Sequence, residues 1–169
     1  HDTFPLLVKT AFPAIKRRRL ETLQANLGYR CNQSCFHCHV AASPKRTEEM
    51  SWETMTVLLE FARRQAVQTF DLTGGAPEMN PNFRRLVSAA RALGLRVIDR
   101  CNLSILSEPG YETMAGFLAE QNVEIVASLP CYLEENVNAQ RGDGAFAASI
   151  AGLRKLNALG YGQAGSDLI

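Results

Sequence analysis

Three cysteines lie close together near the start of the chain. Cys31, Cys35 and Cys38 follow the spacing C-x3-C-x2-C in the segment CNQSCFHCH, and His37 and His39 lie among them. Thiolate and imidazole groups are the ligands that zinc sites use, and thiolates hold iron–sulfur clusters. The spacing therefore predicts a metal-binding loop.

Three kinds of site compete for this loop. A structural zinc site usually joins two ligand pairs from separated segments, whereas this chain has a single cluster. A thioredoxin-like redox pair needs only C-x-x-C and leaves Cys31 without a role. A 4Fe–4S cluster held by three cysteines keeps one iron open for a small molecule. The residues favour the 4Fe–4S cluster, and zinc or a redox pair remain alternatives.

The composition is that of a soluble globular protein, with 169 residues of which 46% are hydrophobic and 21% charged. The net charge of +1 gives no reason to expect a nucleic acid partner. No apolar stretch approaches the roughly 20 residues of a membrane helix, so we expect no membrane partner. Five cysteines, three of them clustered, favour a reducing compartment, and we predict a cytoplasmic protein.

Strand and helix signals alternate along the chain, which predicts an α/β fold with parallel strands and right-handed crossovers. Strands are expected at 22–27, 69–73, 96–101 and 123–129. Helices are expected after an N-cap at Ser51, after the Asn80-Pro81 cap, at 111–120 and, after a long loop, at 145–159. Parallel sheets of this kind bind ligands at the carboxyl ends of their strands. The cysteine loop follows the first strand directly.

The cysteine spacing after the first strand resembles the motif of the radical S-adenosylmethionine (SAM) superfamily. The resemblance implies a partial (β/α)6 barrel, with about four βα units in this chain. It implies a 4Fe–4S cluster on Cys31, Cys35 and Cys38, SAM bound to the fourth iron, and a reductant such as flavodoxin or ferredoxin. The residue before the last cysteine, usually aromatic and close to the adenine, is His37 here.

The resemblance extends to the segment TGGAPE, residues 73–78, which follows the second strand. In the superfamily this glycine-rich segment meets the SAM amino group with its backbone, which assigns Gly74, Gly75 and Ala76 to SAM binding. Glycine permits such a close approach because it has no Cβ. Ala76 stands where the superfamily usually has an acidic residue, and Glu78 comes two places later.

The same resemblance implies further contacts after the third and fourth strands. Asn102 and Ser104 would contact the ribose, and Ser128 the methionine moiety. Arg141 would meet the SAM carboxylate, because a guanidinium group suits that group bidentately. A structural pairing of Arg141 with Asp143 or with a helix end is the alternative.

Longer phrases resemble one branch, the arsenosugar-biosynthesis radical SAM proteins. The likeness runs from about residue 23 to residue 165 and includes LQANLGYRCNQSCFHCHV, FDLTGGAPEMNPNFRRL, VIDRCNL and ASLPCYLEENVNAQRGDGAF. It implies transfer of the 5′-deoxyadenosyl group of SAM to a methylated trivalent arsenical. A peptide or another small metabolite is the alternative substrate, and a non-enzymatic metal-binding module is the alternative function.

Two further cysteines, Cys101 and Cys131, lie at or just past the ends of the third and fourth strands. Trivalent arsenic is soft and prefers thiolate ligands. We therefore hypothesise that both thiols face one cavity and that one or both hold the arsenical. The favoured alternative is that they are small buried hydrophobes, because free cysteine is among the most buried residue types.

Residues 1–20 are interpreted as an N-terminal extension and residues 21–169 as the radical SAM core. The chain ends at GSDLI, where a fifth strand would begin. We therefore expect it to be the N-terminal part of a longer protein, whose remaining strands and C-terminal region are absent.

Overall fold

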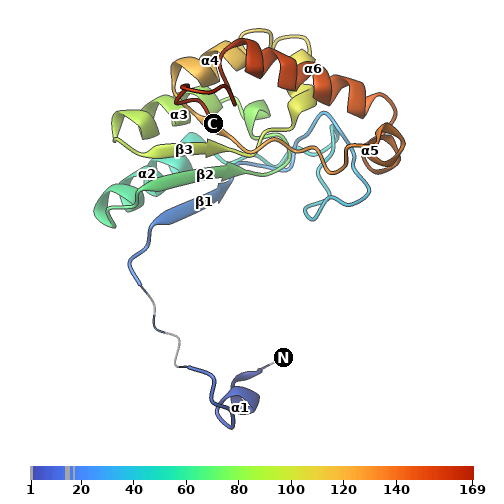
Figure 1. The fold of residues 1–169 in the computed structure, drawn as a ribbon. Helices are drawn as coiled ribbons and strands as arrows, with labels where there is room; N and C mark the ends of the chain where they lie inside the picture. Colours follow the sequence, from blue (N-terminus) through green and yellow to red (C-terminus); the bar gives the residue numbers. More distant parts are fainter. Residues whose placement is uncertain (1, 14–15, 17) are drawn as a thin grey trace.

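Four parallel strands form one sheet in the order β1-β2-β3-β4, as Figure 1 shows for the first three. The structure is a computed structural model that describes residues 2–13, 16 and 18–169. The strands are β1 (Thr22–Asn26), β2 (Thr69–Thr73), β3 (Arg96–Asp99) and β4 (Glu124–Ile125). The pairing begins with Thr22 opposite Thr69 and Thr69 opposite Arg96, so the strands share one direction and one carboxyl edge. The predicted α/β fold with four βα units is confirmed.

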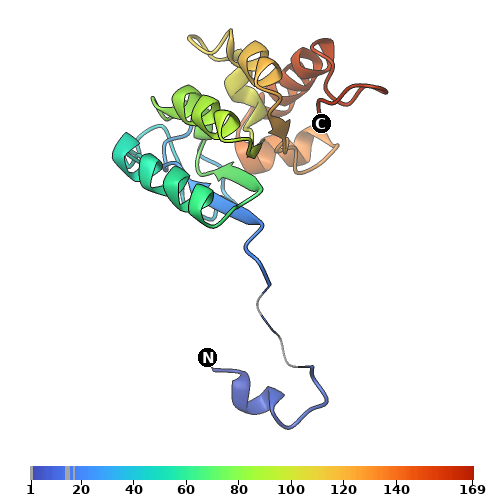
Figure 2. The ribbon, with the colours of Figure 1, turned by 90° about the vertical axis from the view of Figure 1, so that its left-hand side faces the viewer.

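Helices connect the strands and cover the sheet. The longer ones are α2 (Trp52–Arg64), α3 (Phe83–Ala92), α4 (Met114–Glu120), α5 (Glu134–Arg141) and α6 (Ala145–Ala158), and the 3-10 helices are η1 (Pro77–Met79) and η2 (Leu103–Ser107). Figure 1 shows α3, α4 and α6 above the sheet, and Figure 2 shows α2 and α3 side by side.

The main core lies between the sheet and these helices. Phe70 and Leu72 of β2 and Val97 of β3 are completely buried, and they pack with Met55 of α2 and Phe83 of α3. These positions follow the period of two in the strands and the apolar stripe in the helices, as the sequence pattern predicts. The core therefore fixes which side chains of each strand remain on the opposite face.

The two helix starts behave differently. Ser51 caps α2 as predicted, because its hydroxyl oxygen accepts a hydrogen bond of 3.3 Å from the backbone N–H of Thr54. The predicted cap at Asn80-Pro81 is wrong, since α3 begins only at Phe83. The Asn80 side chain instead donates to the carbonyl oxygen of Leu27, at 2.9 Å, and ties the β2 loop to the end of β1.

The carboxyl half of the sheet differs from the prediction. β3 ends at Asp99 and β4 covers only Glu124–Ile125, where the sequence predicts strands to 101 and 129. The residues beyond these ends keep single backbone hydrogen bonds to their neighbours, such as Val126 to Asp99 and Ser128 to Cys101, and several of them line a cavity. Helix α5 lies in the segment where a loop was predicted. The helix was missed because only Val137 and Arg141 among its eight residues are buried, so no apolar stripe marks it in the sequence.

The first described residues form the short helix α1 (Phe4–Leu7), which has no buried side chain. Figure 1 shows α1 away from the sheet. The division into an extension, 1–20, and a core, 21–169, stays a prediction. Among the helices of the described chain, none is both long and apolar enough to cross a membrane.

Candidate functional site

A cavity of about 520 Å³ lies at the carboxyl edge of the sheet and gathers most of the predicted site residues. The cysteine loop contributes Cys31, Cys35 and Cys38 together with His37 and His39. The ends of the other strands contribute the remaining predicted groups, Gly74, Gly75, Asn102, Ser128 and Arg141. Segments that are far apart in sequence therefore meet at one cavity, as expected of parallel strands.

The base of the cysteine loop is closed by backbone hydrogen bonds. The N–H of Cys31 donates to the carbonyl oxygen of Ser43 at 3.2 Å, and the N–H of Ser43 returns one to Tyr29 at 3.2 Å. At the tip of the loop, the N–H of Phe36 donates to the carbonyl oxygen of Gln140 in α5 at 3.0 Å. The loop is therefore fixed at both ends although it contains no helix or strand.

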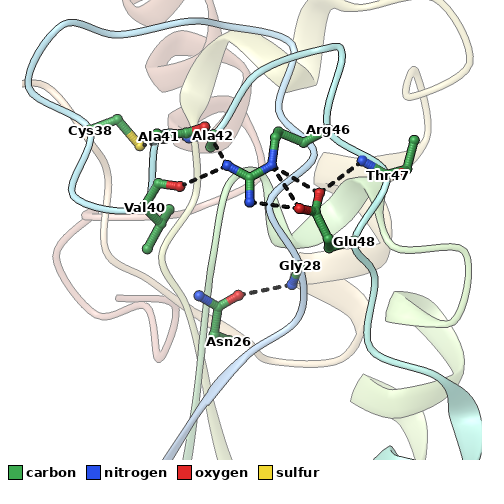
Figure 3. A network of polar contacts seen from close by, with 9 residues as sticks. All are labelled: Asn26, Gly28, Cys38, Val40, Ala41, Ala42, Arg46, Thr47 and Glu48. Atoms are coloured by element: carbon green, nitrogen blue, oxygen red, sulfur yellow. Dashed lines mark hydrogen bonds and ion pairs between the residues drawn. The ribbon is translucent and has the colours of Figure 1, made fainter.

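Arg46 holds the returning limb of this loop, as Figure 3 shows. Its guanidinium group donates to the carbonyl oxygen of Ala41 at 3.1 Å and forms an ion pair of 2.8 Å with Glu48. This ion pair lowers the pKa of Glu48 to about 2. In the same view, the N–H of Ala42 points at the sulfur of Cys38.

Three N–H donors point at the cysteine sulfurs. The N–H of Ala42 lies 3.3 Å from the sulfur of Cys38, and the N–H of Gln33 lies 3.5 Å from the sulfur of Cys31. The side-chain amide of Asn102 donates to the same Cys31 sulfur at 3.5 Å. Burial raises the pKa of Cys31, and the Gln33 N–H opposes this rise. Such donors stabilise a negatively charged sulfur, so the loop suits thiolate ligation.

The residues fit a multi-iron group better than a single ion. All five cysteines are free thiols. Within the described residues, compact groups of potential metal ligands, with every ligand atom within 4.8 Å of the others, do not include the three loop cysteines together. Sulfurs around one tetrahedral zinc would lie about 3.8 Å apart, given zinc–sulfur bonds of about 2.3 Å. At least one pair of these sulfurs therefore lies farther apart than the ligands of a single zinc ion, and this favours a larger cluster on Cys31, Cys35 and Cys38.

The glycine turn after β2 contacts the backbone that leads into the cysteine loop. The N–H of Gly75 donates to Gly28 and that of Ala76 donates to Arg30, both at 2.9 Å. A Cβ on Gly75 would lie 2.3 Å from the Arg30 carbonyl oxygen, so only glycine fits here. Ala76 does not line the cavity, and it packs instead against Cys31 in a small apolar cluster. The predicted backbone contact with SAM stays a prediction.

Asn102 joins the far wall to the cysteine loop. Its amide nitrogen donates to Asn32 at 2.6 Å as well as to the Cys31 sulfur. Its oxygen accepts from Arg141 at 2.8 Å and from the Ser104 hydroxyl at 3.1 Å. Ser104 is buried behind Asn102 and does not line the cavity. Sequence reasoning missed Asn32, because only the folded chain places it beside Asn102.

Arg141 is buried and already has protein partners. Besides Asn102, its guanidinium group donates to the backbone carbonyl oxygen of Ser128. These contacts hold the residues after β3 and β4 at a fixed separation, which gives Arg141 a positioning role. The predicted pairing of Arg141 with the SAM carboxylate, and that of Ser128 with the methionine moiety, stay predictions.

An ion pair inside the barrel was also missed by sequence reasoning. Arg100 lines the cavity and contacts Asp71 of β2 at 2.9 Å, and Gln24 of β1 donates to the same carboxylate at 2.8 Å. This pairing raises the pKa of Arg100. The strand sequence TFDLT contains a signal for it, because Asp71 is a charged residue between Phe70 and Leu72, whose side chains point to the opposite face.

The prediction that Cys101 and Cys131 face one cavity is wrong. Cys101 is completely buried on the helix-covered side of β3, and burial raises the pKa of its thiol. Cys131 is partly exposed, and the N–H of Leu133 and the Asn136 amide lower its pKa. Neither thiol lines the cavity. The strand ends bring these residues near one edge but direct their side chains differently.

The radical SAM superfamily model matches residues 25–169, which is most of the chain. The mycofactocin maturase MftC of Mycobacterium ulcerans is 30% identical over 138 residues, covering 82% of this chain and 37% of that protein. The probable GTP 3′,8-cyclase of Sulfolobus acidocaldarius is 24% identical over 144 residues, covering 82% and 46%. The chain therefore spans less than half the length of these curated relatives.

Solved structures agree on the fold. Streptococcus suis SuiB bound to S-adenosylmethionine has a TM-score of 0.69 at 16% identity, and the match covers 84% of this chain and 32% of SuiB. SuiB bound to its precursor peptide SuiA gives 0.68 at 17% identity, covering 84% and 31%.

The cavity, its three-cysteine loop and the family match lead to one classification. The chain belongs to the radical SAM superfamily, whose members are enzymes that use a 4Fe–4S cluster and SAM. The cysteine loop and the strand ends around it line the cavity, and the assignment of their residues to the cluster and to SAM stays a prediction.

Proposed function

We propose that this chain binds a 4Fe–4S cluster through Cys31, Cys35 and Cys38 and SAM in the adjoining cavity, and that it cleaves SAM reductively. The observation that carries the proposal is the convergence of this loop, the Gly74–Gly75 turn and the residues after β3 and β4 on one cavity. When bound and reduced, the cluster supplies the electron that splits SAM into methionine and a 5′-deoxyadenosyl radical.

The residues of the chain would bind the cluster and SAM and orient them. The N–H groups of Gln33 and Ala42 stabilise thiolate sulfur, and Asn102 reaches Cys31 from the opposite wall. His37 and His39 lie at the exposed rim of the cavity. The superfamily position of His37 supports a contact with the adenine.

The cavity also has apolar walls. Val40, Leu129 and Pro130 line it beside the polar groups. Apolar walls limit the water around bound SAM, and this protects a reactive intermediate from side reactions. Electrons would come from a small redox protein such as flavodoxin or ferredoxin.

The substrate proposed is a methylated trivalent arsenical, which would receive the deoxyadenosyl group. The support is the resemblance to arsenosugar-biosynthesis proteins from about residue 23 to residue 165, including His37 before the last cysteine and Ala76 after the two glycines. Since Cys101 and Cys131 do not line the cavity, this chain presents no thiol there other than those of the cysteine loop among its described residues. The arsenical would then react with the radical without being held by Cys101 or Cys131.

A peptide substrate is the second candidate, supported by the fold likeness to SuiB, which has been solved with a precursor peptide. One assay separates the two. The full-length protein, reconstituted anaerobically, is given dithionite, SAM and dimethylarsinous acid, and the products are separated by chromatography with arsenic detection. An arsenic-bearing nucleoside is expected. Free 5′-deoxyadenosine without it would contradict the arsenical and leave the peptide.

The cluster assignment is tested separately. Cys35→Ala removes one of three protein ligands and is expected to abolish SAM cleavage and the reducible 4Fe–4S signal in electron paramagnetic resonance. Cys131→Ala is the matched control, because Cys131 is outside the cavity. SAM cleavage retained by Cys35→Ala would overturn the assignment.

A further inference from the structure

Glu78, Asp99 and Cys101 meet inside the protein, outside the cavity described above. Glu78 belongs to η1, Asp99 is the last residue of β3 and Cys101 follows two positions later. One potential ligand atom from each lies within 4.8 Å of the other two. The exposed fractions of the three residues are 3%, 0% and 0%. None of the three residues lines the cavity.

The two carboxyl groups have no protein partner that explains their burial. Both oxygens of Glu78 and both oxygens of Asp99 are buried without a hydrogen bond partner in the described chain. Neither residue takes part in an ion pair found among those residues. Two buried carboxylates without a counter-charge are costly, so a cation or a proton must neutralise them.

We propose that Glu78, Asp99 and Cys101 form a second metal site, which binds a divalent cation and suits Zn²⁺ best. Calcium and magnesium take oxygen ligands, whereas a thiolate beside two carboxylates combines soft and hard donors that zinc accepts together. Ligand atoms on tetrahedral zinc lie about 3.3–3.8 Å apart, given its bond lengths of about 2.0–2.3 Å. The ligand atoms of Glu78, Asp99 and Cys101 lie within 4.8 Å of one another, so they need to move only slightly closer together to bind zinc. A water molecule can supply the fourth donor.

The cation would fasten two segments that form the wall of the cavity. Glu78 lies on the turn that follows Gly75, and Cys101 precedes Asn102, whose amide reaches the Cys31 sulfur. A bond through the metal would hold that turn against the end of β3 from behind. This second metal site thus differs from the proposed 4Fe–4S site in its ligands, in its burial and in its role.

The test uses the full chain with Cys31, Cys35 and Cys38 replaced by alanine, so that metal at the loop does not contribute. The protein is loaded with Zn²⁺ or with Co²⁺ as a spectroscopic probe, and unbound metal is removed by gel filtration. About one equivalent of Zn²⁺ is expected to remain. Co²⁺ is expected to show intense tetrahedral absorption bands and a sulfur-to-cobalt charge-transfer band.

Three variants in this background test the ligands. Cys101→Ser is expected to remove the charge-transfer band, and the pair Glu78→Gln with Asp99→Asn to weaken Zn²⁺ binding at least 100-fold. Cys131→Ser is the matched control, because that thiol is partly exposed and outside the cluster of ligands, and it should retain the metal. Retention of less than about 0.1 equivalent by the parent, or binding unchanged in the ligand variants, would overturn the proposal.

A second measurement uses only this triple-alanine parent and does not depend on the folding of the three ligand variants. Zn²⁺ binding to the parent at pH 7 is expected to release at least one proton, because the thiol must ionise, and to raise the melting temperature. Mg²⁺ at the same concentration should do neither. If the carboxyl groups merely share a proton, Zn²⁺ will cause no proton release and no thermal shift, and the site is then not a metal site.

Discussion

Replacing Gly75 with alanine is expected to displace the cysteine loop. An ideal Cβ at this position would lie 2.3 Å from the carbonyl oxygen and 2.8 Å from the carbonyl carbon of Arg30. Both are backbone atoms, so no side-chain rotation relieves the overlap. The same Arg30 carbonyl oxygen accepts the N–H of Ala76 at 2.9 Å, and moving it away from the new methyl group weakens that hydrogen bond.

The magnitude follows from these two effects. Overpacking a tight contact costs about 1–3 kcal/mol, and losing a backbone hydrogen bond adds about 1 kcal/mol. The sum of about 2–4 kcal/mol corresponds to a fall in melting temperature of about 5–15 °C for a chain of this size. Because Cys31 directly follows Arg30, the iron content after anaerobic reconstitution should fall to less than half.

Gly116→Ala is the matched control. Gly116 lies in α4 with nothing within 4 Å of its ideal Cβ, so alanine should raise helix stability by about 1 kcal/mol and the melting temperature by about 2–4 °C. Thermal unfolding followed by circular dichroism, with iron and sulfide analysis, measures both variants. A Gly75→Ala protein that melts within 2 °C of the parent and keeps its iron would refute the reasoning.

The remaining predictions concern the loop anchor and the outlying thiols. Arg46→Ala should speed hydrogen exchange in residues 38–42 roughly two- to fivefold, measured by mass spectrometry, since the exposed pair with Glu48 is a modest anchor. The folded pKa of Glu48 lies below its ordinary value, at about 2, so the pair stabilises the loop above about pH 4.5 and is lost as the pH falls through about 2. The difference in exchange between parent and variant should then shrink to the contribution of the Arg46 hydrogen bond to Ala41. Cys131 should be alkylated by iodoacetamide at a lower pH than an ordinary thiol, whereas buried Cys101 should stay unmodified. Asn136→Ala should slow the alkylation of Cys131 at pH 7 roughly two- to fivefold, because it removes a hydrogen bond to the sulfur. Equal rates in the parent and in Asn136→Ala would argue against this contact.

Local patterns predicted the parts of this fold that local physics decides. The strands, the α2 cap at Ser51 and the cysteine spacing follow from periodicity, hydrogen bonding and ligand chemistry within short segments. Helix α5 was missed because tertiary contacts rather than an apolar stripe hold it, including the Arg141 bonds to Ser128 and Asn102. The Asn32–Asn102 contact was missed for the same reason, since 70 positions separate the two residues.

The error over Cys101 has a simple geometric cause. Side chains alternate between the two faces along a strand and its extended continuation, so being at the carboxyl edge does not fix the face. Arg100 and Asn102 line the cavity, whereas Asp99 and Cys101 point into the protein. One short segment therefore contributes to two environments, the cavity beside the cysteine loop and the buried group formed by Glu78, Asp99 and Cys101.

The buried group of Glu78, Asp99 and Cys101 also bears on the glycine motif after β2. Glu78 does not replace the acidic residue that the superfamily usually has at the position of Ala76, because it lies in the closed group and away from the cavity. Ala76 packs against Cys31, where a longer acidic side chain would have to displace the loop or bury a charge. Any recognition of the SAM amino group by this turn must therefore use backbone carbonyl groups. It follows that substitutions of Glu78 should affect stability and metal content before they affect the affinity for SAM.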